Sequence, residues 1–271
     1  MSTVSGLRRL FRRFLDLTSL SLPDIQKILG LTLVVDDEFD SVAPISIPED
    51  LRVWLEKSDR AHGASYTNEA SIRCKLNLLL VCAHDLVSSS ATQSATLLNI
   101  QMERTWAYSP VEWMETSWVL LGRPDYGIWY GEKEDLDLNV IIIEAKRPCS
   151  GTEGILQALA YMGCVHKKRK DLGKTGTTVY GISTDAMNFS FMKLDNESRI
   201  SWSFKLIGVV GNGFEQVLGL LVYLMKKAAS MSPATSKRTS RRTQQGSGES
   251  DLIFNYGPNM DYEMDDEIDA E

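Results

Sequence analysis

No apolar run in the 271-residue sequence approaches the roughly 20 residues that a membrane-spanning helix needs. Cysteine and histidine are also scarce. The four cysteines form no C-x-x-C pair, and the three histidines have no partner spacing for a zinc site or a hydrolase triad. A membrane span, a disulfide framework and a structural zinc site are therefore not expected. Reduced thiols in an intracellular protein, nuclear or cytoplasmic, are the simplest interpretation.

Basic charge is outweighed by acidic charge, and the formal net charge is −7. Nine acidic residues and no basic residue lie between Glu249 and Glu271, so the remainder of the chain carries a formal charge of +2. The acidity is thus concentrated at the C-terminal end, and the net charge does not exclude a nucleic-acid partner. The contents of 43% apolar and 24% charged residues are typical of a soluble globular protein.

The N-terminal segment lacks the continuous apolar stretch of a secretory signal. Its alternation of arginines with apolar residues predicts an amphipathic basic helix over 7–15, LRRLFRRFL. A helix of the folded domain, a surface-binding helix and a mitochondrial presequence all fit this pattern.

Three regions differ in composition. Residues 1–60 are expected to form a helical N-terminal extension, with a proline-containing loop that leads into a short helix around Val53. Residues 61–228 alternate between helical and extended patterns. Residues 229–271 are rich in Ser, Thr, Gly, Gln and charge, which predicts a disordered tail.

The middle region predicts a mixed α/β (α+β) fold, with a central mixed sheet flanked by helices. Helices are expected at 66–88, 152–168 and 214–227, and Ser150 with Glu153 predicts a capping box for the second of them. Extended segments are expected at 94–103, 116–121, 126–130, 139–145, 177–183, 190–194 and 200–207.

Two acidic residues and a lysine surround one of these extended segments. Val140–Ile143 is a run of β-branched residues, which favours a strand buried on both faces. Because side chains alternate along a strand, Glu144 and Lys146 point to one face, and Ala145 leaves its carbonyl near them. Asp125 stands at the start of the preceding extended segment.

Two carboxylates and a carbonyl are hard oxygen ligands, which suit Mg²⁺ or Mn²⁺ better than zinc. A lysine beside them can orient an attacking water or offset charge that develops on a phosphodiester. The letters D…E-x-K are degenerate, and a solvated Glu and Lys at a strand end are the plain alternative. The buried strand, the neighbouring hairpin strand and the helix that follows favour a site.

Pro124-Asp125 and Glu144-Ala145-Lys146 resemble the signature of the PD-(D/E)XK nuclease superfamily, which has a restriction-endonuclease-like fold. The resemblance covers about residues 66–227. It includes Gln157 and Tyr161, which match a Q-x-x-x-Y pattern on the next helix, and Glu69, which matches an acid on the preceding helix. The segments 179–185 and 189–191 are similar to the corresponding strands of fungal members.

This resemblance implies a metal-dependent nuclease that hydrolyses phosphodiester bonds of nucleic acid, with DNA favoured over RNA as the substrate. It implies Mg²⁺ or Mn²⁺ as the cofactor, held by Asp125, Glu144, the Ala145 carbonyl and Glu69. Lys146 and Gln157 would act in catalysis together with the two strand carboxylates. The alternative is a catalytically inactive binding or interaction module on the same fold, because a fold does not fix a function.

Glu69 and Gln157 each have a plainer interpretation. Glu69 shares the apolar face of its predicted helix, where a carboxylate needs a partner or a metal, but an acid in a first helical turn is also favoured by the helix dipole. Gln157 also fits an exposed helical amide.

A basic cluster ends the predicted helix 152–168. Lysines and arginines at a helix C-terminus compensate the helix dipole, and the same residues can contact a phosphate backbone. The nucleic-acid-binding residues expected on this basis are Lys167, Lys168, Arg169 and Lys170.

Overall fold

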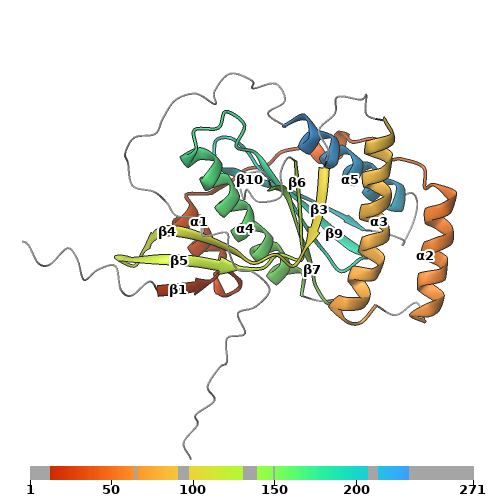
Figure 1. Ribbon diagram of the computed structural model, residues 1–271, viewed down its shortest axis with the longest axis horizontal. Coiled ribbons are helices and arrows are strands. Elements are labelled where there is room, and N and C mark those ends of the chain that lie inside the picture. Colours follow the sequence, from red (N-terminus) through yellow and green to blue (C-terminus); the bar gives the residue numbers. More distant parts are fainter. Residues whose placement is uncertain are drawn as a thin grey trace, which may run out of the picture.

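The structure, a computed structural model, describes residues 13–63, 66–90, 98–130, 139–148, 150–206 and 213–231. In these ranges the chain forms five α-helices and two mixed sheets, one of seven strands and one of three (Figure 1). The predicted mixed α/β fold class is thereby confirmed. No helix in the same ranges is both long and apolar enough to cross a membrane.

The helices are α1 (Leu22–Leu29), α2 (Glu49–Ala61), α3 (Glu69–Ser90), α4 (Gly151–Asp171) and α5 (Gly213–Ser230), with the 3-10 turns η2 (Leu17–Ser19) and η3 (Glu38–Ser41). The seven-stranded sheet has the order β2 (Thr32–Leu33), β10 (Arg199–Leu206), β9 (Asn188–Leu194), β8 (Val179–Thr184), β7 (Asn139–Ala145), β6 (Tyr126–Tyr130) and β3 (Leu98–Met102). The three-stranded sheet has the order β1 (Arg13–Asp16), β5 (Thr116–Gly122) and β4 (Trp106–Trp113).

Strand β7 lies near the centre of the large sheet, antiparallel to β6 and parallel to β8. Parallel neighbours need a crossover connection, and α4 provides it. The β-branched run 140–143 is buried on both faces, as predicted. Ile142 belongs to the cluster under α4, whereas Ile141 and Ile143 belong to the cluster under α3 and α5.

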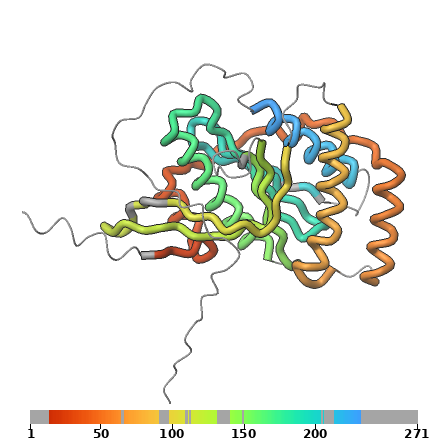
Figure 2. The backbone as a smooth tube through the Cα atoms, viewed as in Figure 1, coloured from red at the N-terminus to blue at the C-terminus, as the bar shows by residue number. Residues whose placement is uncertain are grey.

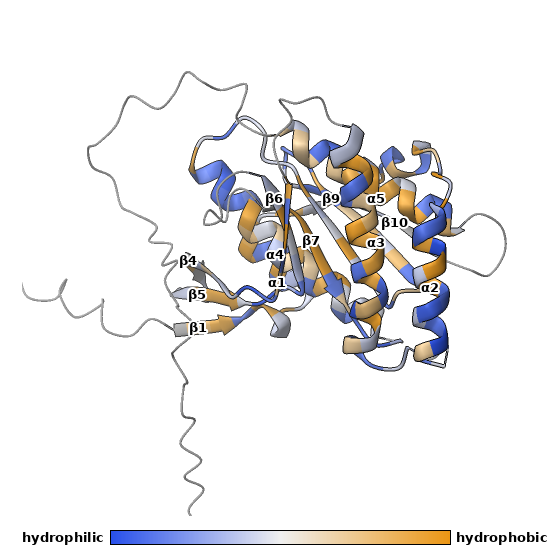
Figure 3. Cartoon of the chain, turned by 45° about the vertical axis from the view of Figure 1, so that its right-hand side comes forward, coloured by the Kyte–Doolittle hydropathy of each residue, from blue (hydrophilic) through white to orange (hydrophobic). Residues whose placement is uncertain are grey.

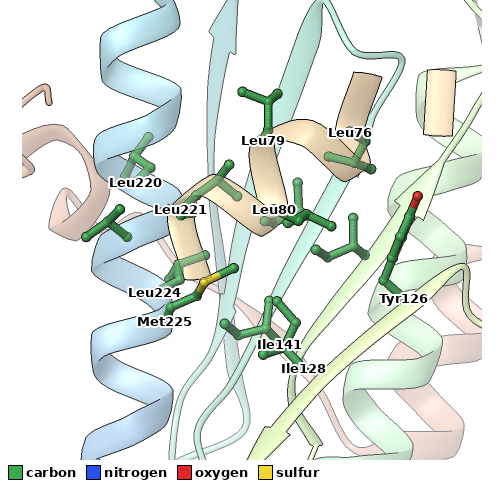
Figure 4. Close-up of a cluster of buried hydrophobic side chains, with 14 of the residues drawn as sticks. Leu76, Leu79, Leu80, Tyr126, Ile128, Ile141, Leu220, Leu221, Leu224 and Met225 are labelled. Atoms are coloured by element: carbon green, nitrogen blue, oxygen red, sulfur yellow. The ribbon is translucent and has the colours of Figure 1, made fainter. Parts of the chain in front are cut away.

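One face of the sheet is covered by α3 and α5. The predicted apolar stripe of α3 is buried, and Figure 4 shows Leu76, Leu79 and Leu80 packed near residues of α5 and above Ile128 and Ile141. Figure 3 shows hydrophobic residues concentrated on α3, α5 and the strands, whereas α2 is largely hydrophilic. Burial of this stripe holds α3 against the sheet. It therefore also fixes the position of the polar side chains that α3 places next to the edge of the sheet.

The opposite face is covered by α4, with α1 packed beside it (Figure 2). The two helices approach closely at Gly163, where a Cβ atom would lie 2.4 Å from Leu29 Cδ1. Only a glycine leaves room for this contact, so α4 is held between the sheet and the N-terminal segment.

Residues before 61 contribute to both cores of the described chain. Ile25 and Leu29 belong to the cluster under α4, whereas Phe39 and Leu51 belong to the cluster under α3 and α5. Strand β2 also extends the large sheet by pairing parallel to β10. The residue 60 boundary predicted for an N-terminal extension therefore does not separate two cores.

The predicted helix 7–15 differs from the structure at its C-terminal end. Residues 1–12 lie outside the described ranges, and Arg13–Asp16 form strand β1, which pairs parallel with β5. A short apolar run fits a helix or a strand equally well, and here the free edge of β5 decides in favour of a strand. The helix of this region is instead α1, where Ser21 and Asp24 form a capping box and Gly30 ends the helix at φ 69°.

Two further local predictions fail for identifiable reasons. Strand β4 was not predicted, since it contains Pro110 and an irregularity between Tyr108 and Val111, both of which weaken a strand pattern. Ser150 precedes α4, but its side chain makes no capping hydrogen bond, because its backbone (φ −101°, ψ 22°) is outside the extended conformation that a side-chain cap requires. The predicted tail at 229–271 lies outside the described residues beyond Met231.

Candidate metal centre

Glu144 is the second-last residue of β7, and its side chain is only 3% exposed. Strand alternation turns it to the face of Ile142, which is the face that α4 covers. The parallel register sets it beside Ser183 of β8. The sheet therefore carries this carboxylate into a position that solvent barely reaches.

Asp125 directly precedes β6 and is held at the end of β7. Its Oδ2 accepts the Ala145 N–H at 2.7 Å, and its main-chain carbonyl accepts the Glu103 N–H at 3.0 Å. Since β6 and β7 are antiparallel with Tyr126 opposite Ile143, Asp125 and Glu144 are the next pair in the same register. Opposed residues of antiparallel strands have Cβ atoms about 4.5–5.5 Å apart, and the charge of Asp125 acts on the titration of Glu144, so the two carboxyl groups are near neighbours.

Lys146 completes the predicted trio. Its Nζ lies 3.4 Å from Glu144 Oε2, and its backbone N–H continues the pairing with β8 by donating to the Thr184 carbonyl at 2.8 Å. The first turn of α4 packs directly on this lysine: the space is so small that a Cβ atom at Gly154 would lie 2.7 Å from Lys146 Cγ. The ammonium group is thus fixed next to the buried carboxylate.

The electrostatics of the pair are those of two crowded acids. Burial raises the pKa of Glu144 to about 8, the nearby charge of Asp125 adds to the rise, and Lys146 opposes it. Burial also raises the pKa of Asp125, against the Ala145 N–H and Arg73. Within the described chain, Glu144 Oε1 is buried without a hydrogen-bond partner. A buried carboxylate oxygen without a donor is costly; the raised pKa lets a proton relieve this cost in the metal-free fold, and a bound cation would do the same.

Gln157 and Tyr161 lie on one face of α4, three and seven residues after Gly154. The Tyr161 hydroxyl accepts the Arg123 N–H at 3.0 Å, so it holds the connection that leads into Asp125. Burial and the charge of Glu144 raise the pKa of this phenol. Gln157 is half-buried and lies between Gly154 and Tyr161 on this helix.

Glu69 differs from the expectation. It is the first residue of α3, and its charge raises the pKa of Asp125, but only as the smallest of the five contributions. In the described part of the chain, no three acidic, histidine or cysteine side chains gather as a metal-binding group.

Arg73 is a site residue that sequence reasoning missed. Its Nη1 lies 3.2 Å from Asp125 Oδ1, and the same atom forms an ion pair with Glu103. Its position one helical turn after Glu69 was the available signal, because residues four apart share a helix face. Arg123 and Arg147, both exposed, flank the site in sequence beside Pro124 and Lys146.

The predicted basic cluster requires a correction. Arg169 is 2% exposed, and its guanidinium holds the Gly176 carbonyl at 2.8 and 2.5 Å, so it faces the interior rather than a ligand. Lys168 is also buried, and Lys170 Nζ donates to Ser198 Oγ at 2.6 Å; Lys167 is half-buried. The cluster begins 13 residues after Gly154, which is about 20 Å further along the helix and away from the candidate site.

No protein-family model matches this chain, and no curated protein matches it with significance. The assignment of a function therefore depends on the residues of the chain itself.

Proposed function

We propose that this chain is a Mg²⁺- or Mn²⁺-dependent nuclease that hydrolyses phosphodiester bonds, with DNA as the favoured substrate, on a restriction-endonuclease-like fold. The observation that supports it most is the buried Glu144 Oε1, which has no hydrogen-bond partner among the described residues. Asp125 stands next to it in the strand register, and Lys146 Nζ lies 3.4 Å from the other oxygen of Glu144.

The donor set fits a hard divalent cation. Glu144 and the Ala145 carbonyl offer oxygen ligands from β7, where both residues pair with β8, and Asp125 offers its carboxylate from the start of β6, where Ala145 and Glu103 hydrogen-bond to it. A bound ion of this kind acts as a Lewis acid on a phosphoryl oxygen and lowers the pKa of water.

Lys146 and Gln157 supply the polar groups around the reacting phosphate in this proposal. An ammonium group can only donate, so Lys146 can orient an attacking water through its lone pair or hold a negatively charged phosphate oxygen. Its side chain is 14% exposed, which leaves little solvent to screen that charge. The amide of Gln157 adds a second donor from α4.

Exposed arginines support a nucleic-acid substrate more directly than the predicted cluster at the end of α4. Arg123 and Arg147 lie on the two segments that carry Asp125 and Lys146. Arginine binds phosphate through two parallel hydrogen bonds, and phosphate contacts set the register of a duplex on a protein. These two residues are the proposed backbone contacts.

One observation favours the alternative of an inactive binding module. Both carboxylate oxygens of Asp125 already have protein donors, the Ala145 N–H and Arg73. A carboxylate with a purely structural role would look the same. Each oxygen has a second lone pair, so the arrangement is compatible with a metal ligand as well.

The test is cleavage of DNA and RNA by the full chain with Mg²⁺, Mn²⁺ or a chelator. Lys146→Ala should lower the rate by roughly 10²–10³, the usual effect of removing one charge-stabilising donor, and Glu144→Gln should abolish metal-dependent cleavage. Lys170→Ala and Glu197→Gln, both remote and exposed, are the matched controls and should cleave normally. The nuclease proposal fails if the wild type cleaves no substrate, and if the wild type and all variants bind DNA or a protein equally well. The inactive binding module is then the better description.

A further inference from the structure

Arg73 is shared between two acids of unequal exposure. Its Nη1 lies 3.2 Å from Asp125 Oδ1 and also contacts Glu103, whose side chain is 44% exposed compared with 13% for that of Asp125. The guanidinium therefore has a partly buried partner inside the candidate metal centre and a more solvated partner at its rim.

The main chain fixes this arrangement on both sides. Glu103 has a φ of 51°, which is uncommon for a residue with a Cβ atom, and its N–H donates to the Asp125 carbonyl at 3.0 Å. On the helix side, the Tyr126 hydroxyl lies 3.3 Å from the Arg73 carbonyl and 2.7 Å from Asn77 Oδ1. The backbones around the guanidinium are thus tied to the strand that begins after Asp125, and only the long side chain is free to redistribute.

We propose that Arg73 sets the divalent-metal affinity of the site, by balancing the charge of Asp125 when the ion is absent and transferring to Glu103 when it binds. This inference rests on the proposed function, because it requires an ion at Asp125 and Glu144. A divalent cation beside Asp125 repels a guanidinium 3.2 Å from one of its oxygens. Glu103 is already in contact with Arg73. After the transfer, Arg73 is paired with Glu103 and Asp125 is paired with the ion, so neither Arg73 nor Asp125 is left without a partner. Arg73 is accordingly a positioning residue.

The test is Mn²⁺ titration of the full-length protein, followed by electron paramagnetic resonance or calorimetry. Arg73→Met should bind Mn²⁺ on the order of tenfold more tightly, because the competing charge is gone. Glu103→Gln should bind it more weakly by a similar factor, since Arg73 then has only Asp125 to pair with. Arg52→Met, an exposed arginine on α2 that pairs with Glu49 and Glu56, should leave the affinity unchanged.

A double-mutant cycle separates this exchange from a simple effect of charge. If Glu103 acts through Arg73, Glu103→Gln should change the affinity of the Arg73→Met protein by less than about twofold. An equal loss in both backgrounds, or an unchanged affinity in Arg73→Met, would overturn the inference. If Arg73→Met does not fold, Arg73→Lys replaces it: this shorter cation cannot bridge both acids, so Glu103→Gln should lose its effect there too.

The failure of this inference differs from the failure of the proposed function. Wild-type protein that binds no Mn²⁺ at all overturns both. Wild-type protein that binds Mn²⁺, with Arg73 and Glu103 variants unchanged, overturns only the role of Arg73.

Discussion

In the metal-free fold, Glu144 keeps a proton between about pH 4.5 and pH 8, where the same residue of the unfolded chain has lost it. Its pKa rises from an ordinary value of 4.5 to about 8, chiefly through burial and then through the charge of Asp125. Because the folded-state pKa lies above the unfolded one, the contribution to stability is complete below pH 4.5. It is lost as the pH rises toward 8. Above pH 8 the metal-free fold contains the buried carboxylate of Glu144 beside the partly buried carboxylate of Asp125.

Glu144→Gln should therefore stabilise the metal-free protein at high pH. The amide keeps the shape and removes the charge, so the free energy of unfolding at pH 9 should rise by on the order of 1–4 kcal/mol, with little change near pH 4.5. Urea unfolding with a chelator at both pH values measures this, with Glu197→Gln as the exposed control. The same effect at both pH values would mean that burial does not shift the titration of Glu144.

At the scale of single residues, the sequence predicts the direction of a side chain well where that direction follows from the strand that carries it. The alternation of a strand puts Glu144 and Lys146 on one face, and the structure brings both together with Asp125. Sequence reasoning missed Arg73, whose partners lie 30 and 52 residues away across a helix–sheet contact. Among Lys167, Lys168, Arg169 and Lys170, charge alone could not show that Arg169 is buried.

At the scale of elements, the seat of α4 on the strand ends controls the geometry of the candidate site. A Cβ atom at Gly154 would lie 2.3 Å from Ser183 Oγ and 2.7 Å from Lys146 Cγ. Three residues earlier on the same helix, Gly151 has no neighbouring atom within 4 Å of its Cβ position. The two glycines form a matched pair, one packed and one open.

Gly154→Ala should displace the first turn of α4 from Lys146. Overpacking of this kind costs about 1–3 kcal/mol of stability. The affinity for Mn²⁺ should also fall, because the displaced Lys146 side chain is pushed toward Glu144, a proposed metal ligand. Gly151→Ala should be neutral or slightly stabilising, because alanine favours a helix and has room there. Urea unfolding and Mn²⁺ titration of both variants provide the comparison. Equal behaviour of the two would contradict a close seat of the helix at Gly154.

Long elements were predictable because their pattern repeats over several turns. The apolar stripe of α3 and the apolar composition of α5 identify helices without tertiary information. Short elements depend on their surroundings: β1 spans only Arg13–Asp16 and is a strand because β5 offers an edge to pair with. Strand β4 is connected to β5 by a turn at Met114 and Glu115, which have positive φ values of 49° and 59°. Such turns usually contain glycine or asparagine, and because this one contains neither, its sequence does not predict a hairpin.

At the scale of the whole molecule, the N-terminal residues close the structure through polar contacts as well as apolar ones. The Glu38 carboxylate accepts hydroxyl groups of Tyr223 at 2.6 Å and Tyr180 at 3.2 Å, and it forms an ion pair with Lys193. It thereby joins η3 to α5, β8 and β9. The two tyrosines lie 185 and 142 residues away in sequence, which is why composition alone suggested an extension outside the main domain.

The two ends of the chain should consequently differ in their importance for folding. Removal of residues 1–60 takes Ile25, Leu29, Phe39 and Leu51 out of both cores, and truncating one such buried side chain already costs about 2–5 kcal/mol. These four alone total about 8–20 kcal/mol, which is comparable with the roughly 5–15 kcal/mol that stabilises a typical domain, and Leu17, Leu20, Ile28, Leu31 and Leu55 are lost with them, so this deletion should yield insoluble or unfolded protein. Removal of residues 232–271, whose composition is too polar to offset the entropy of ordering, should leave the melting temperature unchanged. Thermal unfolding of the two truncated proteins and of the full chain, followed by circular dichroism, measures the melting temperatures that test both expectations. A cooperative transition in the protein that begins at residue 61 would show that the N-terminal segment is an accessory after all.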